Sequence, residues 1–153
     1  NIKFFTSGLQ ELNLNIIGPR ATSSFGVESP ESGFGISDNT WWSSKDTLPQ
    51  AVWYQFPIPV VVTKYSFRTR SDSFMVENGP SKYEIFGSNA SDCSDQASWI
   101  TLLQENSDKP FTSKNDPKSG YILNPKSFLC YGIKVINCPG NDRTSVSNIK
   151  FYT

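Results

Sequence analysis

Apolar and polar residues alternate along residues 62–70 of this chain. One face of the alternation carries Thr63, Tyr65, Phe67 and Thr69, and the other carries Val62, Lys64, Ser66, Arg68 and Arg70. A period of two with β-branched and aromatic residues is typical of a half-buried strand. The pattern predicts one strand over residues 60–70 that ends in two arginines.

A polar loop over residues 71–80 follows this strand and ends in the turn-forming pair Gly79-Pro80. The loop carries Phe74 and Met75 among polar residues, and a second strand is expected at residues 83–86. Two arginines thus end a strand beside a loop with apolar side chains. We expect a binding site, if the chain has one, at this place.

The rest of the chain predicts further short strands and no long helix. Residues 12–40 are rich in loop-forming residues, and strands are expected at residues 49–56, 97–103, 121–123, 131–137 and 146–152. Many short strands with frequent Gly and Pro turns predict an all-β sandwich or barrel.

Composition narrows the possible functions. The 153 residues suffice for one packed domain, and 14 basic residues balance 14 acidic ones without a charge run, which gives no electrostatic reason to expect nucleic acid binding. No apolar run is long enough to cross a bilayer. The chain has no histidine, which removes the commonest general base and most zinc sites. A non-catalytic binding module is therefore expected, and not an enzyme.

The three cysteines, Cys93, Cys130 and Cys138, leave the redox state open. Cys130 and Cys138 lie on one expected extended segment, about 26 Å apart, which is too far for a disulfide. Cys93 could pair with either of them. Three reduced thiols are the favoured interpretation, and the sequon at Asn89 has meaning only in a secreted chain.

The two ends of the chain carry nearly the same sequence. Residues 1–6 and residues 148–153 match at five of six positions. The match fits either two copies of an edge strand or the closing strand of a preceding copy in a tandem array. We favour the second interpretation, in which residues 1–11 are a linker or the tail of a preceding repeat and residues 12–153 are the domain.

Seven short motifs follow one another in an order that resembles the coagulation factor 5/8 type C (discoidin) domain of the galactose-binding-like superfamily. The resemblance covers about residues 12–153 and is carried by residues 40–44, 53–56, 65–70, 83–89, 98–102, 131–135 and 147–152. It implies a jelly-roll β-sandwich of about eight main antiparallel strands, with ligand-binding loops at one end. Such domains bind sugars, phospholipid headgroups or protein partners.

The resemblance divides the aromatic and charged residues into core and site. It places Trp42 in the core and leaves Trp41 either as a stacking platform for a sugar ring or as ordinary partial burial. Arg70 falls where sugar-binding relatives carry an arginine, whose fixed fork of donors suits vicinal hydroxyls, a carboxylate or a phosphate. The other candidate ligand-binding residues are Arg68, Asp72, Phe74 and Asn78.

Two departures from the family pattern concern sugar type and metal. Fucose- and galactose-binding relatives usually add a histidine, which this chain lacks. A structural calcium would use Asp38, Thr40 and Asn148, but Asn148 stands where relatives carry a glutamate. Calcium prefers six to eight oxygen ligands with several carboxylates.

We therefore expect a β-sandwich recognition module that binds a glycan or glycoprotein at the cell surface or outside the cell. Tandem copies or oligomers would raise the avidity of a weak single site. Two alternatives remain. A membrane-binding discoidin domain would use Trp41, Phe74 and Met75 as anchors, and a protein-interaction module of this fold could also be intracellular.

Overall fold

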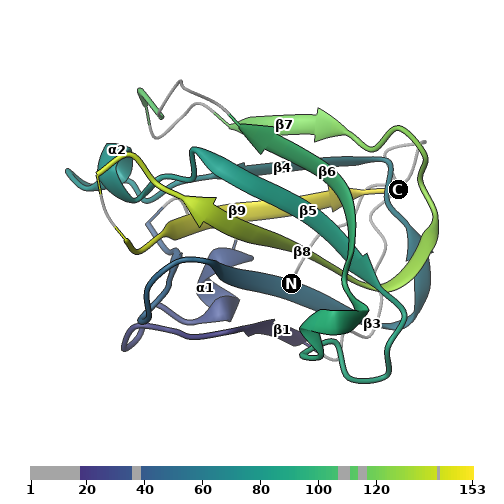
Figure 1. Cartoon of the computed structure of the whole chain (residues 1–153). Coiled ribbons are helices and arrows are strands. Elements are labelled where there is room, and N and C mark those ends of the chain that lie inside the picture. The colour runs from purple at the N-terminus through teal and green to yellow at the C-terminus, as the bar shows by residue number, and fades with distance from the viewer. Residues whose placement is uncertain (1–17, 36–38, 107–110, 114–116, 141) are drawn as a thin grey trace.

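The computed structural model describes residues 18–35, 39–106, 111–113, 117–140 and 142–153, and these residues form a sandwich of two antiparallel sheets (Figure 1). One sheet has the strand order β1 (Gly18–Ala21), β3 (Gln50–Val61), β8 (Ser127–Asn137), β5 (Lys82–Ser88) and β6 (Ile100–Asn106). The other has the order β2 (Trp42–Ser43), β9 (Ser145–Tyr152), β4 (Lys64–Arg68) and β7 (Lys118–Tyr121). The predicted all-β sandwich is confirmed.

The core lies between the two sheets, and strand β4 shows how the sequence specifies it. Tyr65 and Phe67 are buried, whereas Lys64 and Arg68 on the opposite face stay partly exposed, as the alternation predicts. The Tyr65 hydroxyl lies 3.0 Å from the Tyr83 hydroxyl of the facing sheet. The two hydroxyls satisfy each other inside the core, where an unpaired polar group would be costly.

Trp42 is fully buried, which agrees with its expected place in the core. Its indole Nε1 donates to the Ser23 carbonyl at 2.8 Å. Trp42 therefore anchors the loop that follows β1.

The expected strand over residues 60–70 is wrong at both ends, because β4 spans only Lys64–Arg68 and Arg70 lies beyond it. Residues 60 and 61 end β3, and the chain reverses through Val62 and Thr63 before β4 begins. Residues 60–64 contain no Gly, Asn or Pro of the kind that usually marks a turn. The reversal is instead held by the neighbouring strands, because the Thr63 amide donates to the Tyr152 carbonyl at 2.8 Å.

Three short helices interrupt the strands: α1 (Pro30–Gly33), α2 (Met75–Asn78) and the 3-10 turn η1 (Gln96–Ser98). The strand expected at residues 97–103 therefore begins later, at Ile100. Asp95 explains this delay, since its carboxylate accepts from the Ala97 amide at 3.1 Å and caps η1. None of the helices among the described residues has the length and apolarity needed to span a bilayer.

The expectation of three reduced thiols is wrong. Cys93 and Cys130 form a disulfide, with their Cα atoms 6.4 Å apart, while Cys138 is free and buried. The loop after β5 brings Cys93 back over β8, a long-range contact that no spacing in the sequence reveals. Burial raises the pKa of the Cys138 thiol to about 11, so this thiol is protonated at neutral pH.

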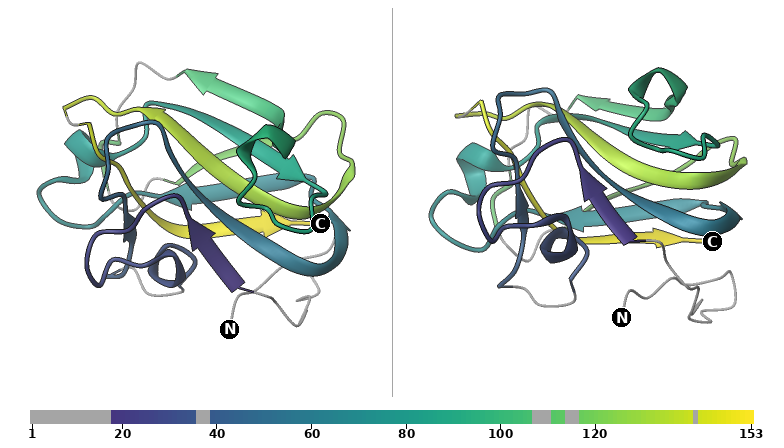
Figure 2. Two further views of the ribbon diagram at one scale, coloured as in Figure 1. Left: turned by 60° about the horizontal axis from the view of Figure 1, so that its bottom comes forward. Right: turned by 90° about the horizontal axis from the view of Figure 1, so that it is seen from below.

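The two ends of the sandwich differ in what they carry. In both views of Figure 2 and in Figure 1, α2 lies at the end where β8 finishes and β9 begins. The chain finishes at the opposite end, where Ile149 and Phe151 of β9 pack into the core. The expected linker or repeat tail at residues 1–11 lies outside the described residues.

Candidate binding site

An open pocket of about 230 Å³ lies at the α2 end of the sandwich. Four separate segments build it: the loop after β1, strand β2 with the residue after it, the loop between β4 and β5, and the segment before β9. The lining residues are Phe25, Glu28, Ser43, Ser44, Arg70, Phe74, Asn78 and Arg143.

Arg70 is held in one orientation at the centre of this site. Its guanidinium lies over the Trp41 ring, 4.7 Å from the centroid, and over the Phe74 ring at 5.4 Å. Nε and Nη2 donate to the two carboxylate oxygens of Asp72 at 2.6 and 2.5 Å. This bidentate pair and the two rings fix the plane of the donor fork before any ligand arrives.

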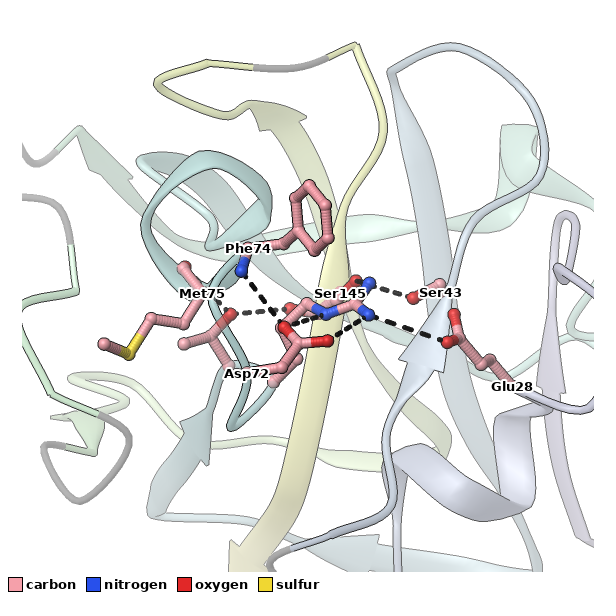
Figure 3. A network of polar contacts seen from close by, with 8 residues as sticks. Glu28, Ser43, Asp72, Phe74, Met75 and Ser145 are labelled. Atoms are coloured by element: carbon pink, nitrogen blue, oxygen red, sulfur yellow. Dashed lines mark hydrogen bonds and ion pairs between the residues drawn. The ribbon is translucent and has the colours of Figure 1, made fainter.

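Asp72 also shapes the loop that supplies Phe74. Its carboxylate accepts from the Phe74 amide at 3.1 Å, a local bond typical of an Asx turn (Figure 3). Thr69 donates from its hydroxyl to the Met75 carbonyl at 3.2 Å and holds the start of α2. The hydrogen bond from Arg70 keeps the pKa of Asp72 below its usual range, so the pair stays ionised at neutral pH.

Opposite Asp72 lie Glu28 and Ser43 of the pocket lining and the buried Ser145 behind them. A carboxylate oxygen of Glu28 lies 3.9 Å from Nη2 of Arg70 (Figure 3). The Ser43 hydroxyl lies 2.6 Å from that of Ser145, and Arg70 Nη1 reaches the Ser145 hydroxyl at 3.5 Å. Strand pairing sets these positions, since Ser43 and Ser145 are register partners in β2 and β9.

Two half-exposed rings border the pocket. Phe25 is 51% exposed and Phe74 is 50% exposed, and the Arg143 guanidinium lies over the Phe25 ring at 5.7 Å. Asn78 is buried, and its backbone carbonyl accepts from the Thr144 hydroxyl at 3.1 Å. A few fixed polar groups between apolar rings suit a small polar ligand with apolar faces.

The structure brings three of the predicted site residues to the pocket: Arg70, Phe74 and Asn78. Asp72 holds Arg70 and is not a lining residue. Arg68 ends β4 on its outer face, and the pocket does not include it. The role expected for Arg68 therefore has no support from its position.

Trp41 lies beneath Arg70 and borders a second, smaller hollow. This hollow of about 180 Å³ is lined by Val27, Glu28, Ser32, Asn39, Thr40 and Trp41. Because Glu28 belongs to both hollows, the two are neighbours. Trp41 thus contacts Arg70 and also lines this second hollow.

The expected calcium site stays a prediction. Asp38 lies outside the described residues, Thr40 is exposed, and Asn148 is buried in β9 with a left-handed backbone (φ 49°). Among the described residues, no group of three or more Cys, Asp or Glu side chains could hold a metal ion. Thr40 and Asn148 offer a hydroxyl and an amide, which fit the carboxylate-rich preference of calcium poorly.

Five lining residues were not predicted from the sequence: Phe25, Glu28, Ser43, Ser44 and Arg143. Among these five, only Phe25 has a sequence pattern that could have predicted a place at the site, because it is an aromatic residue next to a glycine in a polar stretch. Glu28 is the one carboxylate among the described lining residues.

No family model and no curated protein matches this chain in sequence. Solved structures do match its fold. The chain is similar to a domain titled CpGH89CBM32-5 from Clostridium perfringens, solved in complex with GalNAc-beta-1,3-galactose. The TM-score is 0.71 at 16% identity, and the match covers 89% of this chain and 94% of that one.

Two further structures show the same likeness. The family 32 carbohydrate-binding module of NanJ from C. perfringens, in complex with galactose, matches with a TM-score of 0.68 at 19% identity over 86% of this chain and 90% of that one. The family 32 module of AlyQ, in complex with 4,5-unsaturated mannuronic acid, matches with a TM-score of 0.66 at 15% identity, covering 90% and 95%. The chain has the fold of these modules.

Proposed function

We propose that this chain is a non-catalytic carbohydrate-binding module and that the pocket around Arg70 is its sugar site. The observation that carries the proposal is the held guanidinium of Arg70 beside the exposed ring of Phe74. The guanidinium has five N–H donors, and those of Nη1 and Nη2 that do not bind Asp72 or Ser145 match two neighbouring sugar hydroxyls. An aromatic face matches the C–H face of a pyranose. The similar structures support the proposal, since several were solved with sugars.

The finer assignment is a discoidin-like module that works outside the cell or on its surface. The order of sequence motifs and the shared sandwich fold support the discoidin resemblance. The disulfide between Cys93 and Cys130 supports an oxidising compartment, because such bonds are rare in reducing cytosol.

The proposal is tested with a glycan array, followed by calorimetry on the sugars that bind. We expect Arg70→Ala to lower the affinity for each bound sugar by at least about tenfold, the usual cost of removing a charged hydrogen-bonding partner. Arg20→Ala is the matched control, because Arg20 is an exposed arginine on β1 outside the pocket lining. Binding that survives Arg70→Ala unchanged would refute this site.

One observation favours a second candidate, a membrane surface. Phe25 and Phe74 are half-exposed, and Val27 is 93% exposed in the same loop as Phe25. Exposed apolar side chains on neighbouring loops can insert into the interfacial region of a bilayer. Sedimentation with phosphatidylcholine and phosphatidylserine vesicles tests this candidate, with Val27→Ser as the variant that should abolish association.

A further inference from the structure

The two arginines of the pocket differ in how they are bound. Arg70 is 14% exposed and gives its donors to Asp72 and Ser145. Arg143 is exposed, and within the described part of the chain its guanidinium makes one cation–π contact, with the Phe25 ring at 5.7 Å. Both guanidinium groups line the same pocket. Only Arg70 has its charge matched by a bidentate carboxylate.

An exposed arginine without a carboxylate partner is common on protein surfaces. Arg143 differs from that ordinary case in its position. It lines the pocket, and its guanidinium lies over the half-exposed Phe25 ring that borders the pocket. A cation held over an aromatic face keeps its edge donors free for a ligand.

Glu28 does not neutralise Arg143. Its carboxylate lies 3.9 Å from Arg70, and the described residues include no ion pair between Glu28 and Arg143. Asp72 is already taken by Arg70. Among the described residues, no carboxylate lies within ion-pair distance of Arg143, so its guanidinium donors stay available to a ligand.

We propose that Arg143 selects an acidic sugar, with its guanidinium binding a carboxylate or sulfate group on the saccharide. The inference rests on the proposed function and names the class of sugar that the site prefers. The Arg70 fork and the Phe74 ring would bind the neutral hydroxyls and the ring face, and Glu28 would accept from a hydroxyl. Bidentate guanidinium binding suits both carboxylate and sulfate oxygens.

The test uses matched neutral and acidic probes with the folded chain. Calorimetry compares galactose with galacturonic acid and galactose 6-sulfate, and glucose with glucuronic acid and glucose 6-sulfate. We expect at least one acidic sugar to bind about tenfold more tightly than its neutral partner, and this preference to weaken in high salt. The carboxylate and sulfate arms show which anion the site prefers.

Arg143→Ala should lower the affinity for the acidic sugar much more than the affinity for its neutral partner, and so remove most of the preference. Arg143→Lys keeps the charge without the fork and should give an intermediate preference. Arg20→Ala removes the same charge elsewhere and should leave both affinities unchanged.

Three results would overturn the inference. The first is equal binding of acidic and neutral sugars, and the second is a preference for acidic sugars that survives Arg143→Ala. Either result would overturn the role of Arg143 but would leave the sugar site itself supported. If no sugar binds, either neutral or acidic, the proposed function fails together with the inference.

Discussion

Two aromatic clusters in this protein contain similar residues but have different roles. The closed cluster consists of Trp53, Phe86 and Trp99 beside the Cys93–Cys130 disulfide. Phe86 and Trp99 stack with their centroids 4.0 Å apart, and Trp99 Nε1 donates to the Cys93 carbonyl at 2.8 Å. The three rings pack against one another and Trp99 Nε1 is paired, although the buried Trp53 Nε1 has no hydrogen-bond partner among the described residues. The packing of this cluster therefore serves the fold.

The open cluster consists of Trp41, Arg70 and Phe74. A guanidinium takes the place that a ring has in the closed cluster, and it contacts both aromatic rings. Phe74 stays half-exposed beside the pocket. In the open cluster, the charged and planar guanidinium packs between the rings less closely than a third ring would. In exchange, hydrogen-bond donors and one ring face stay accessible to a ligand.

Removing the disulfide should break the closed cluster with the largest effect. Cys93→Ser with Cys130→Ser removes a cross-link between residues separated by 37 positions. From the loop-closure entropy, we expect the unfolding free energy to fall by about 4 kcal/mol. Urea unfolding measures this loss. Sugar affinity at low temperature should stay the same, because the open cluster lies at the other end. A large loss of affinity in the folded variant would contradict the separation of the two clusters.

The alternation of residues was enough to predict the sandwich and the inward faces of β4. It could not predict the disulfide, because Cys93 reaches Cys130 through a loop whose path depends on the packing of Trp99. The alternation also predicted one continuous strand where the structure has the end of β3 and the start of β4, because the turn between them carries no turn-forming residue. Local patterns report which face is buried, and long-range contacts are invisible to them.

The site was predicted in part for the same reason. Arg70, Phe74 and Asn78 lie within ten residues of one another, so one loop places them together. Glu28 and Arg143 come from segments more than a hundred positions apart, and only the folded sheets bring both to the pocket. The local sequence around a single charged residue in a loop does not indicate which distant residues it will lie beside.

Trp99→Phe sharpens the comparison through a single hydrogen bond. The substitution keeps an aromatic ring but removes the donor to the Cys93 carbonyl and some apolar area, and should cost about 2 kcal/mol of unfolding free energy. Trp41→Phe is the matched control, because Trp41 Nε1 has no hydrogen-bond partner among the described residues. It should cost less than about 1 kcal/mol by the same measurement. Equal costs would mean that the hydrogen bond contributes little.

Phe74→Ala tests whether the open cluster serves binding. The half-exposed ring buries little area, so the unfolding free energy should change by less than about 1 kcal/mol. Affinity for a bound sugar should fall about tenfold, because the stacking face is lost. Calorimetry and thermal melting together check this prediction. A large loss of stability with unchanged affinity would make Phe74 a packing residue like those of the closed cluster.

The smallest expected effect concerns the carboxylate that holds Arg70. The lowered pKa of Asp72 means that the ion pair is fully present above about pH 4, the usual pKa of an aspartate, and is lost as the pH falls through the lower folded value. Sugar affinity should therefore be constant from pH 7 to about pH 4 and decrease below it.

Asp72→Asn should lower affinity only about threefold at pH 7, because the carboxylate is partly exposed and its pairing is screened by water. The variant should also lack the acid decrease, since no proton can be taken up at this position. Calorimetric titrations between pH 3 and pH 7 would compare the two proteins. If Asp72→Asn kept the same acid decrease, the decrease would not come from Asp72, and the orientation of Arg70 would not depend on the ionisation of that carboxylate.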